Sequence, residues 1–179
     1  VGGGAGGLEL ATQLGDLLGK SQKARITLVD QKLTHIWKPL LHEIAAGTMN
    51  THDEGTNYFA HSAKHHYEFI LGRLDKVERD QKQIILAKSQ ASKYEQTNET
   101  LTLSYDTLIL AVGSVSNDFN TTGVKEFCHY LDTPTQAEIF QQDLLHLYLD
   151  AQNQNSDREL HIGIIGAGAT GVELAAELV

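Results

Sequence analysis

The sequence predicts an α/β fold, in which helices flank a parallel sheet, and a repeated glycine-rich turn is the observation that predicts it. Both copies have the form G-x-G-x-x-G, and they begin at Gly2 and Gly166. Seven of ten positions match between residues 2–11 and 166–175, at an offset of 164 residues. Apolar residues at helical spacing follow each turn. A repeat of this kind indicates two similar strand–turn–helix units in one chain.

Glycines at this spacing suit a turn that approaches a phosphate. The first permits the tight turn, the second lets the backbone approach a diphosphate, and the third lets helix and strand pack closely. The free N–H groups at the start of the helix then face the negative charge. The alternative is a purely structural glycine turn. The expected phosphate contacts are Gly2, Gly4, Ala5, Gly6 and Gly7 in the first turn, and Gly166, Gly168 and Gly171 in the second.

The first turn begins a complete helix–strand pattern. Apolar residues at helical spacing over residues 8–18 predict a helix that ends at Gly19, a good C-terminal cap. A strand over 24–29 then ends at Asp30, which stands 23 residues after Gly7. A Rossmann unit places at this point the acid that binds a ribose. The alternative is an acid that only ends a strand.

The second turn follows a predicted strand over residues 160–165 and opens a helix that reaches the end of the sequence. Its ribose-binding acid would lie about 20 residues beyond Gly171, past Val179, so a preference for NADH or NADPH stays open. Because both ends of the sequence interrupt predicted elements, we expect a piece of a longer protein. Two dinucleotide sites in one polypeptide indicate electron transfer between two dinucleotides, for which FAD and a nicotinamide are the natural pair.

The composition excludes several other classes of protein. The formal charge is −9, and no cluster of Lys or Arg contradicts this acidic balance, which argues against nucleic-acid binding. The longest unbroken aliphatic run is 108–112, far short of a membrane span. A single cysteine, Cys128, excludes an internal disulfide framework and a C-x-x-C redox or zinc site.

The stretch between the two turns predicts a β-hairpin, a further strand and a further helix. A strand over 67–80 returns through 83–86 as a hairpin, and polar residues 88–100 form a surface loop. Residues 105–114 are predicted to form a strand that is buried on both faces. A capping box over 133–136 begins a helix. One face of that helix carries Ala137, Phe140, Leu144 and Leu147.

Four histidines, His52, His61, His65 and His66, raise the question of a metal site. His61 and His65 are four residues apart, which places them on one face of a helix. No cysteine and no adjacent pair of carboxylates completes a tetrahedral set. We therefore expect an exposed helix here and no metal.

The run from His35 to Gly47, HIWKPLLHEIAAG, resembles the type II NADH:quinone oxidoreductases, the single-subunit flavoproteins of respiratory chains. The resemblance extends to both glycine turns and to residues 108–120 and 123–126. It implies a Rossmann-like FAD/NAD(P)-binding fold, a parallel sheet with helices and a β-meander. By this resemblance residues 1–125 are the first segment of the FAD-binding domain, and 126–179 begin a second Rossmann-like domain that binds NADH.

The same resemblance assigns roles to single residues, each with a plainer alternative. The first turn and Asp30 would bind FAD, and Lys38 would lie close to the flavin rather than being a solvated lysine. Val77 would contact the FAD adenine through its backbone, although a strand valine is also typical of a core. Glu173 would lie near the junction of nicotinamide and flavin. The plainer explanation of Glu173, and also of Glu9, is that the helix dipole stabilises a carboxylate at this position. Ala111, Val112 and Gly113 would also neighbour the flavin, the alternative being that Gly113 simply ends a strand.

The resemblance implies transfer of electrons from NADH through FAD to a quinone, without proton pumping. NADH and the quinone would be the substrates. A C-terminal part beyond residue 179 would attach the protein to the cytoplasmic side of the cell membrane. A homodimer is also consistent with the resemblance.

Two alternatives stay beside this interpretation, and a third class is excluded. A sulfide:quinone oxidoreductase-like flavoprotein would use Cys128 with further cysteines, and otherwise Cys128 is a small buried residue. A disulfide reductase is excluded, because no C-x-x-x-x-C pair accompanies the first helix. The chain could also be a catalytically silent nucleotide-binding fragment.

Overall fold

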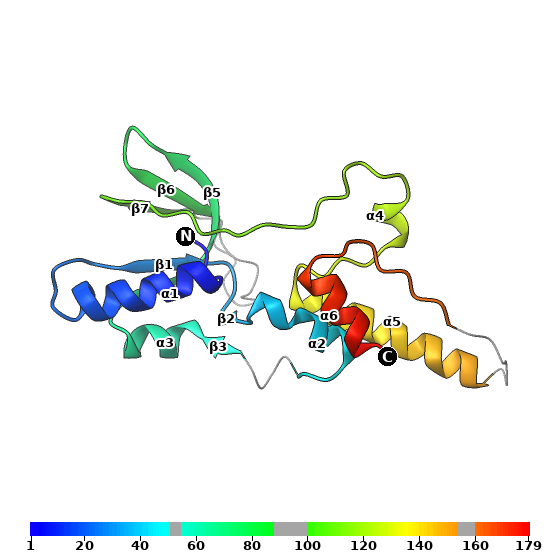
Figure 1. The fold of residues 1–179 in the computed structure, drawn as a ribbon. Coiled ribbons are helices and arrows are strands. Elements are labelled where there is room, and N and C mark those ends of the chain that lie inside the picture. The colour runs from blue at the N-terminus through cyan, green and yellow to red at the C-terminus, as the bar shows by residue number, and fades with distance from the viewer. Residues whose placement is uncertain (51–54, 88–99, 154–159) are drawn as a thin grey trace. The chain divides into compact units, whose positions relative to one another are not determined.

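The computed structural model describes residues 1–50, 55–87, 100–153 and 160–179. The chain divides into two compact units. Unit 1 comprises residues 1–35 and 55–113, and unit 2 comprises 36–54 and 114–179. Figure 1 follows the order of the elements along the chain. None of the described helices combines the length and the apolar character that crossing a bilayer requires.

Unit 1 begins with helix α1, Ala5–Leu14, which continues as one π-helical segment, Gly15–Gly19. The predicted C-terminal cap at Gly19 is wrong, because Gly19 is still helical and the cap is Lys20 in a right-handed conformation. The glycines at 15 and 19 serve packing instead. A Cβ at either position would overlap a backbone carbonyl oxygen, that of His65 or His66 respectively.

A parallel strand pair lies beside α1. Strand β1, Thr27–Asp30, pairs with β4, Glu68–Leu71, and Asp30 stands opposite Leu71 at its end. Helix α3, Tyr58–Lys64, precedes β4 and is capped by Asn57, whose Oδ1 accepts from the Ala60 amide at 3.1 Å. The predicted strand that ends at Asp30 is confirmed, although β1 is shorter than predicted. The strand predicted over 67–80 breaks at Gly72, and β4 is its first part. The predicted helix forms as α3, but it is exposed only in part, because Tyr58 and Ser62 are buried. The short strands β2, Thr34–His35, and β3, Thr56–Asn57, form a separate antiparallel pair.

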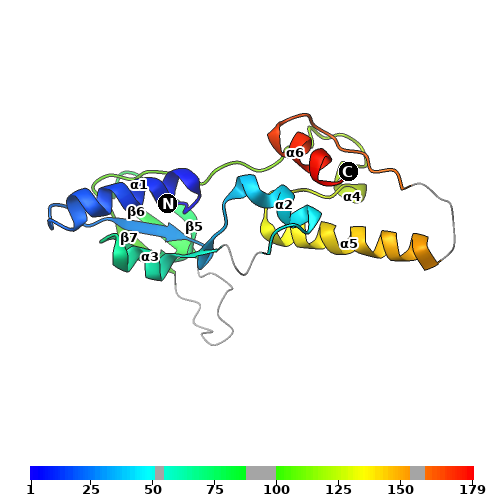
Figure 2. The same ribbon diagram turned by 60° about the horizontal axis from the view of Figure 1, so that its bottom comes forward.

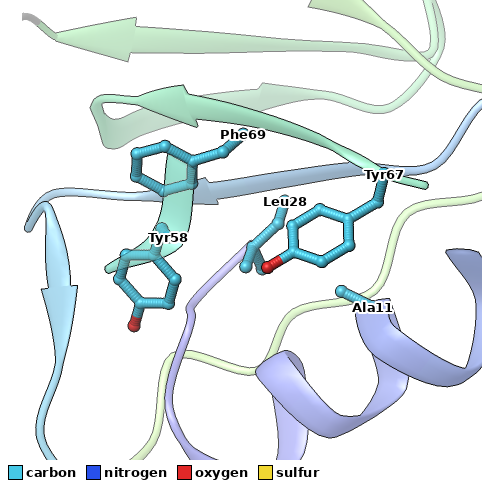
Figure 3. Close-up of a cluster of buried hydrophobic side chains, with 5 residues drawn as sticks. All are labelled: Ala11, Leu28, Tyr58, Tyr67 and Phe69. Carbon is cyan, nitrogen blue, oxygen red and sulfur yellow. The ribbon is translucent and has the colours of Figure 1, made fainter. Parts of the chain in front are cut away.

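The core between these elements is a cluster that contains two tyrosines (Figure 3). The Tyr58 and Phe69 rings stack with centroids 4.9 Å apart. Helices α1 and α3 and strands β1 and β4 all contribute to the cluster. Its buried members are Ala11, Leu28, Tyr58, Tyr67 and Phe69.

The predicted β-meander is confirmed as an antiparallel sheet of three strands in the order β5–β6–β7, best seen in Figure 1. The strands are β5, Arg73–Glu78, β6, Gln83–Ala87, and β7, Leu101–Ser104. Buried side chains of β6, Ile84 and Leu86, form a second cluster with Val29 of β1. The loop predicted at 88–100 lies almost entirely outside the described residues.

The strand predicted over 105–114 does not form as expected. Its hydrogen-bonded partner is Val1: the Val1 amino group donates to Ile109 O and the Ala111 amide donates to Val1 O, each at 2.7 Å. Two hydrogen bonds to a single residue do not make the repeated pattern of backbone hydrogen bonds that joins two strands. Val112 is 67% exposed, so the prediction of burial on both faces is wrong.

Unit 2 is built from helices. They are η2, Lys38–Leu40, which is a 3₁₀ turn, α2, Leu41–Ala46, α4, Val124–Phe127, α5, Pro134–Asn153, and α6, Ala169–Glu177. Figure 2 shows the same elements from a second direction. The core of the unit joins three of these helices through Leu41, Ile44, Ala45, Ala137 and Leu174.

The capping box of α5 is confirmed. The Gln136 amide donates to Thr133 Oγ1 at 3.3 Å, and Gln136 Oε1 accepts from the Thr133 amide at 3.1 Å. The expected face of the helix is only partly buried: Ala137 is fully buried, whereas Leu147 is 52% exposed.

The strand predicted over 160–165 does not form in the described structure. Residues 160–167 have no regular secondary structure, and Ile165 is 80% exposed. A strand needs a hydrogen-bonded neighbour, and the described part of unit 2 contains no strand that could pair with it.

We predict that Gly15→Ala destabilises the protein by about 1–3 kcal/mol, because the new methyl group must displace the backbone at His65. The matched control is Gly6→Ala in the same helical segment, where a Cβ meets nothing within 4 Å. That variant should be neutral or slightly more stable, since alanine favours helix. Urea unfolding of the flavin-free protein measures both, and equal effects would contradict the close approach.

Candidate functional site

The first glycine turn lies between the start of the chain and α1. Gly2 has φ +98°, in the region where side chains are strained, and a Cβ there would overlap Ala111 O. At Gly7 a Cβ would overlap Gly2 O. The turn therefore depends on the absence of side chains at Gly2 and Gly7.

The second turn has the same local geometry. Gly166 has φ +108°, and a Cβ at Gly171 would overlap Gly166 O. The residues that precede the two helices also agree: Gly4 has φ −63° and ψ −176°, and Gly168 has φ −75° and ψ 176°. The structure thus confirms that the sequence repeat is a repeat of backbone conformation.

The middle glycine of each turn faces open space. A Cβ at Gly4 or Gly168 would meet nothing within 4 Å, and neither residue has a strained φ. The glycine is therefore not required by the protein's own packing. Open space at the N-terminus of a helix, with its unpaired N–H groups, fits the approach of a diphosphate. On this test both turns could hold a dinucleotide.

Asp30 lies at the end of β1, beside the first turn. Its Oδ2 accepts from the Gly3 amide at 2.6 Å, and its Oδ1 accepts from the Lys32 amide at 2.9 Å. Each carboxylate oxygen keeps a further lone pair that can accept a hydroxyl. The structure therefore brings together the glycine turn and the acid that the sequence singled out.

Tyr58 also reaches this turn, and sequence reasoning missed it. Its hydroxyl donates to Gly3 O at 2.6 Å, and the side chain is 2% exposed. Burial, together with the charge of Asp30, raises the pKa of Tyr58 above its ordinary range, so the hydroxyl stays a donor. No local motif signals this contact, because 55 residues separate the partners.

The segment over 111–113 runs past the same turn. The Ala111 methyl group would lie 3.2 Å from a Cβ at Gly7, and Gly113 has φ +73° with open space around it. Val77 is half-buried in β5, opposite Ile84, and packs against the cluster that contains Val29. Ala111 is thus close to the first turn, while the side chain of Val77 belongs to the core.

Lys38 is half-exposed but is held by two oxygens of unit 2. Its Nζ donates to Ser114 O at 2.9 Å and to Asp132 Oδ1 at 3.0 Å. Asp132 also accepts from the Ser116 amide and hydroxyl. Burial raises the pKa of Asp132, but the bonds from Ser116 and Lys38 outweigh it, and the pKa falls below its ordinary value. A freely solvated lysine is therefore the wrong description.

Glu173 lies on α6 and faces α2. Its Oε2 is 3.3 Å from Nδ1 of His42, a buried atom that makes no hydrogen bond of good geometry within the described residues. The first turn of α6 contains no acidic residue, because Glu173 is the fifth residue of the helix. Its counterpart Glu9 is also fifth, and it accepts from Gln13 along α1 at 2.6 Å. A position in the first helical turn therefore explains neither glutamate.

The histidines are engaged with the protein. His61 Nδ1 lies 3.0 Å from the Tyr67 hydroxyl, and His65 Nδ1 lies 2.9 Å from Asp16 Oδ2. Burial, with the neighbouring charges of His65 and Lys64, lowers the pKa of His61. Across the described ranges no three His, Cys, Asp or Glu side chains come together as a metal site. His52 lies outside the described residues.

The chain matches known proteins along its whole length. The family described as pyridine nucleotide-disulphide oxidoreductase matches residues 1–179. A type II NADH:quinone oxidoreductase of Haemophilus influenzae is 44% identical over 193 aligned positions, which cover 99% of this chain. The chain spans only 44% of the length of that protein.

Two solved structures share the fold. NDH2 from Plasmodium falciparum, solved in complex with RYL-552, has a TM-score of 0.79 at 23% identity, over 98% of this chain and 35% of its own. The sulfide:quinone oxidoreductase of Aquifex aeolicus has a TM-score of 0.65 at 24% identity, over 83% of this chain and 31% of its own. These likenesses confirm the predicted Rossmann-like fold.

The family's description includes a disulphide activity, yet this sequence has one cysteine, Cys128, and so no cysteine pair. What the chain shares with the family is the dinucleotide-binding architecture, with its glycine turns before α1 and α6. The full-length match and the paired turns agree, and the chain belongs to the pyridine nucleotide-disulphide oxidoreductase family.

Proposed function

We propose that this chain is the flavin-binding and NADH-binding portion of a type II NADH:quinone oxidoreductase. The observation that carries the proposal is the pair of glycine turns, which have one backbone geometry in a single polypeptide. An enzyme that uses one dinucleotide needs one such turn, whereas hydride transfer between two dinucleotides needs two. The 44% identity to the Haemophilus influenzae protein supports this activity over others of the same fold.

The first turn is the proposed FAD site. Open space at Gly4 admits the diphosphate, the N-terminus of α1 faces its charge, and Asp30 accepts hydroxyls of the adenosine ribose. Ala111 supports the proposal by its approach to Gly7. The proposed FAD contacts are Gly2, Gly4, Ala5, Gly6, Gly7, Asp30, Lys38, Val77, Ala111, Val112 and Gly113.

The second turn is the proposed NADH site, through Gly166, Gly168 and Gly171. We place the functional boundary near residue 125, with 1–125 serving FAD and 126–179 beginning the NADH-binding domain. The structural division between unit 1 and unit 2 comes earlier, after Gly113. The boundary near 125 therefore rests on the resemblance and on the start of α5.

In this mechanism the bound flavin supplies the redox chemistry, accepting a hydride and passing electrons on. The protein's residues bind and orient. The glycine turns receive the two diphosphates, Asp30 fixes the adenosine end of one dinucleotide, and Lys38 is held by Ser114 and Asp132. Glu173, beside His42, is the proposed catalytic side chain, and the resemblance assigns it to the neighbourhood of the nicotinamide and flavin. No acid–base triad is needed.

The remaining parts of the proposal concern the whole protein. The quinone is the electron acceptor, and attachment to the cytoplasmic face of the membrane is peripheral, through sequence beyond residue 179. A homodimer is part of the proposal. These rest on the resemblance to the type II enzymes.

Optical spectroscopy tests the proposed activity directly. The purified protein should show flavin absorbance, NADH should bleach it without oxygen, and a soluble quinone should restore it. Sodium sulfide is the discriminating control, since bleaching by sulfide and not by NADH would favour the sulfide:quinone alternative. A colourless protein that takes up no FAD would overturn the proposal.

We predict that the two middle glycines separate the two sites. Gly4→Ala should weaken FAD binding roughly tenfold or more, because its methyl group fills the space for the diphosphate. Gly168→Ala should leave FAD binding unchanged and raise the KM for NADH by a similar factor. Neither change should lower the free energy of unfolding of the flavin-free protein, since both Cβ positions are open. Loss of FAD in both variants, or in neither, would contradict the assignment.

We predict that Glu173→Gln lowers kcat for quinone reduction by roughly tenfold, the size of one charge-assisted hydrogen bond, with FAD content unchanged. The matched control is Glu9→Gln, which alters the same position of the first repeat but only a contact within α1. Stopped-flow measurement of both half-reactions shows which step slows. Equal rates in the two variants would remove Glu173 from the mechanism.

A further inference from the structure

The Gly3 residue of the first turn is held at both of its backbone polar groups. Its N–H donates to Asp30 Oδ2 and its C=O accepts from the Tyr58 hydroxyl, each at 2.6 Å. The Tyr58 ring occupies the space that a Cβ at Gly3 would need. A glycine at position 3 is therefore a requirement of this clamp, outside the G-x-G-x-x-G pattern.

The clamp fixes the direction of the next peptide group. The described residues contain no cis peptide, and in a planar trans peptide the C=O and N–H bonds point in opposite directions. Since Gly3 O points inward to buried Tyr58, the Gly4 N–H must point to the opposite side. A Cβ at Gly4 would meet nothing within 4 Å, so the turn is open at this residue.

The preceding peptide obeys the same rule. Gly3 N–H points to Asp30, so Gly2 C=O points away from Asp30. It faces α1 at Gly7, where a Cβ would overlap it. Asp30 and Tyr58 thus determine the orientation of two successive peptide groups.

Tyr58 is suited to hold this orientation rigidly. It is 2% exposed and stacks on Phe69 at an interplanar angle of 20°. A hydroxyl on a packed ring has little freedom to follow a moving backbone, because core side chains occupy single rotamers. The Gly3 carbonyl is therefore tied to the core of unit 1.

The second turn has Ala167 at the position of Gly3. A Cβ at Gly3 would overlap the Tyr58 ring and hydroxyl. A tyrosine packed in the same way could therefore not accompany the alanine of the second turn.

We propose that Tyr58 is a positioning residue for the flavin site, which orients the Gly4 N–H toward the diphosphate and so lets this turn retain its dinucleotide. The inference rests on the proposed FAD site at this turn. A turn ordered in advance loses less conformational entropy when its ligand binds. Without the hydroxyl, the buried Gly3 carbonyl loses its partner and the peptide can rotate.

Tyr58→Phe tests the proposal, and Tyr67→Phe is its control. Both tyrosines belong to one core cluster, with their hydroxyls at separate places (Figure 3). The Tyr67 hydroxyl lies 3.0 Å from His61 Nδ1 instead of the glycine turn. Each variant removes one oxygen and keeps the ring. If the Tyr58 hydroxyl contributed only to the stability of the core, the two substitutions would have the same effects.

The first measurement is the dissociation constant of FAD for the flavin-free purified protein, followed by flavin fluorescence. Tyr58→Phe should raise it roughly tenfold, about 1.4 kcal/mol, while Tyr67→Phe should leave it within about twofold. Urea unfolding of the flavin-free variants records their stability separately. Unchanged FAD binding in Tyr58→Phe, or equal weakening in both variants, would overturn the proposal.

The second measurement needs no flavin. Hydrogen–deuterium exchange of the peptide covering residues 1–8 should be faster in Tyr58→Phe than in the parent protein, and unchanged in Tyr67→Phe. Unchanged exchange would refute the clamp itself. Faster exchange together with no FAD uptake by the parent protein would instead refute the proposed flavin site, so the two failures can be distinguished.

Discussion

The contact between the third glycine and the carbonyl oxygen of the first is the constraint on which both candidate sites depend. A side chain at Gly7 would collide with Gly2 O, and one at Gly171 would collide with Gly166 O. This contact lets the helix begin directly beside the end of the preceding segment. The helix N–H groups then lie at the surface, available to an anion. Any larger residue would move the helix away and remove the site.

Asp30 and Tyr58 build on that contact in the first turn. Asp30 is the last residue of β1, which pairs with β4. Tyr58 is the first residue of α3. Both reach Gly3, a glycine at a position that the motif leaves unspecified. The binding loop is thus an extension of the core rather than a loop attached to it. That connection explains how a segment so rich in glycine can hold one conformation.

The glycine turns, Asp30 and the hairpin of β5 and β6 could be predicted because their signals are local. A spacing of three glycines, an acid after a buried strand and a hairpin all show within about 30 residues. Tyr58 and Asp132 could not, since Tyr58 meets Gly3 across 55 residues and Asp132 meets Lys38 across 94. The strand predictions at 105–114 and 160–165 failed for a related reason. Sequence pattern shows that a segment can be a strand, but only a neighbouring strand makes it one.

The comparison of Glu173 with Glu9 shows what helix stability explains in the repeat and what it does not. Both glutamates are the fifth residue of a helix that follows the same turn, so helix stability acts on them equally. Glu9 is satisfied within its own helix by Gln13. Glu173 faces a buried His42 nitrogen that has no hydrogen bond of its own in the described residues. Leaving such a group unsatisfied costs about 1–3 kcal/mol. The stability of α6 therefore does not account for this pair, and the proposed chemistry at the second turn accounts for it better.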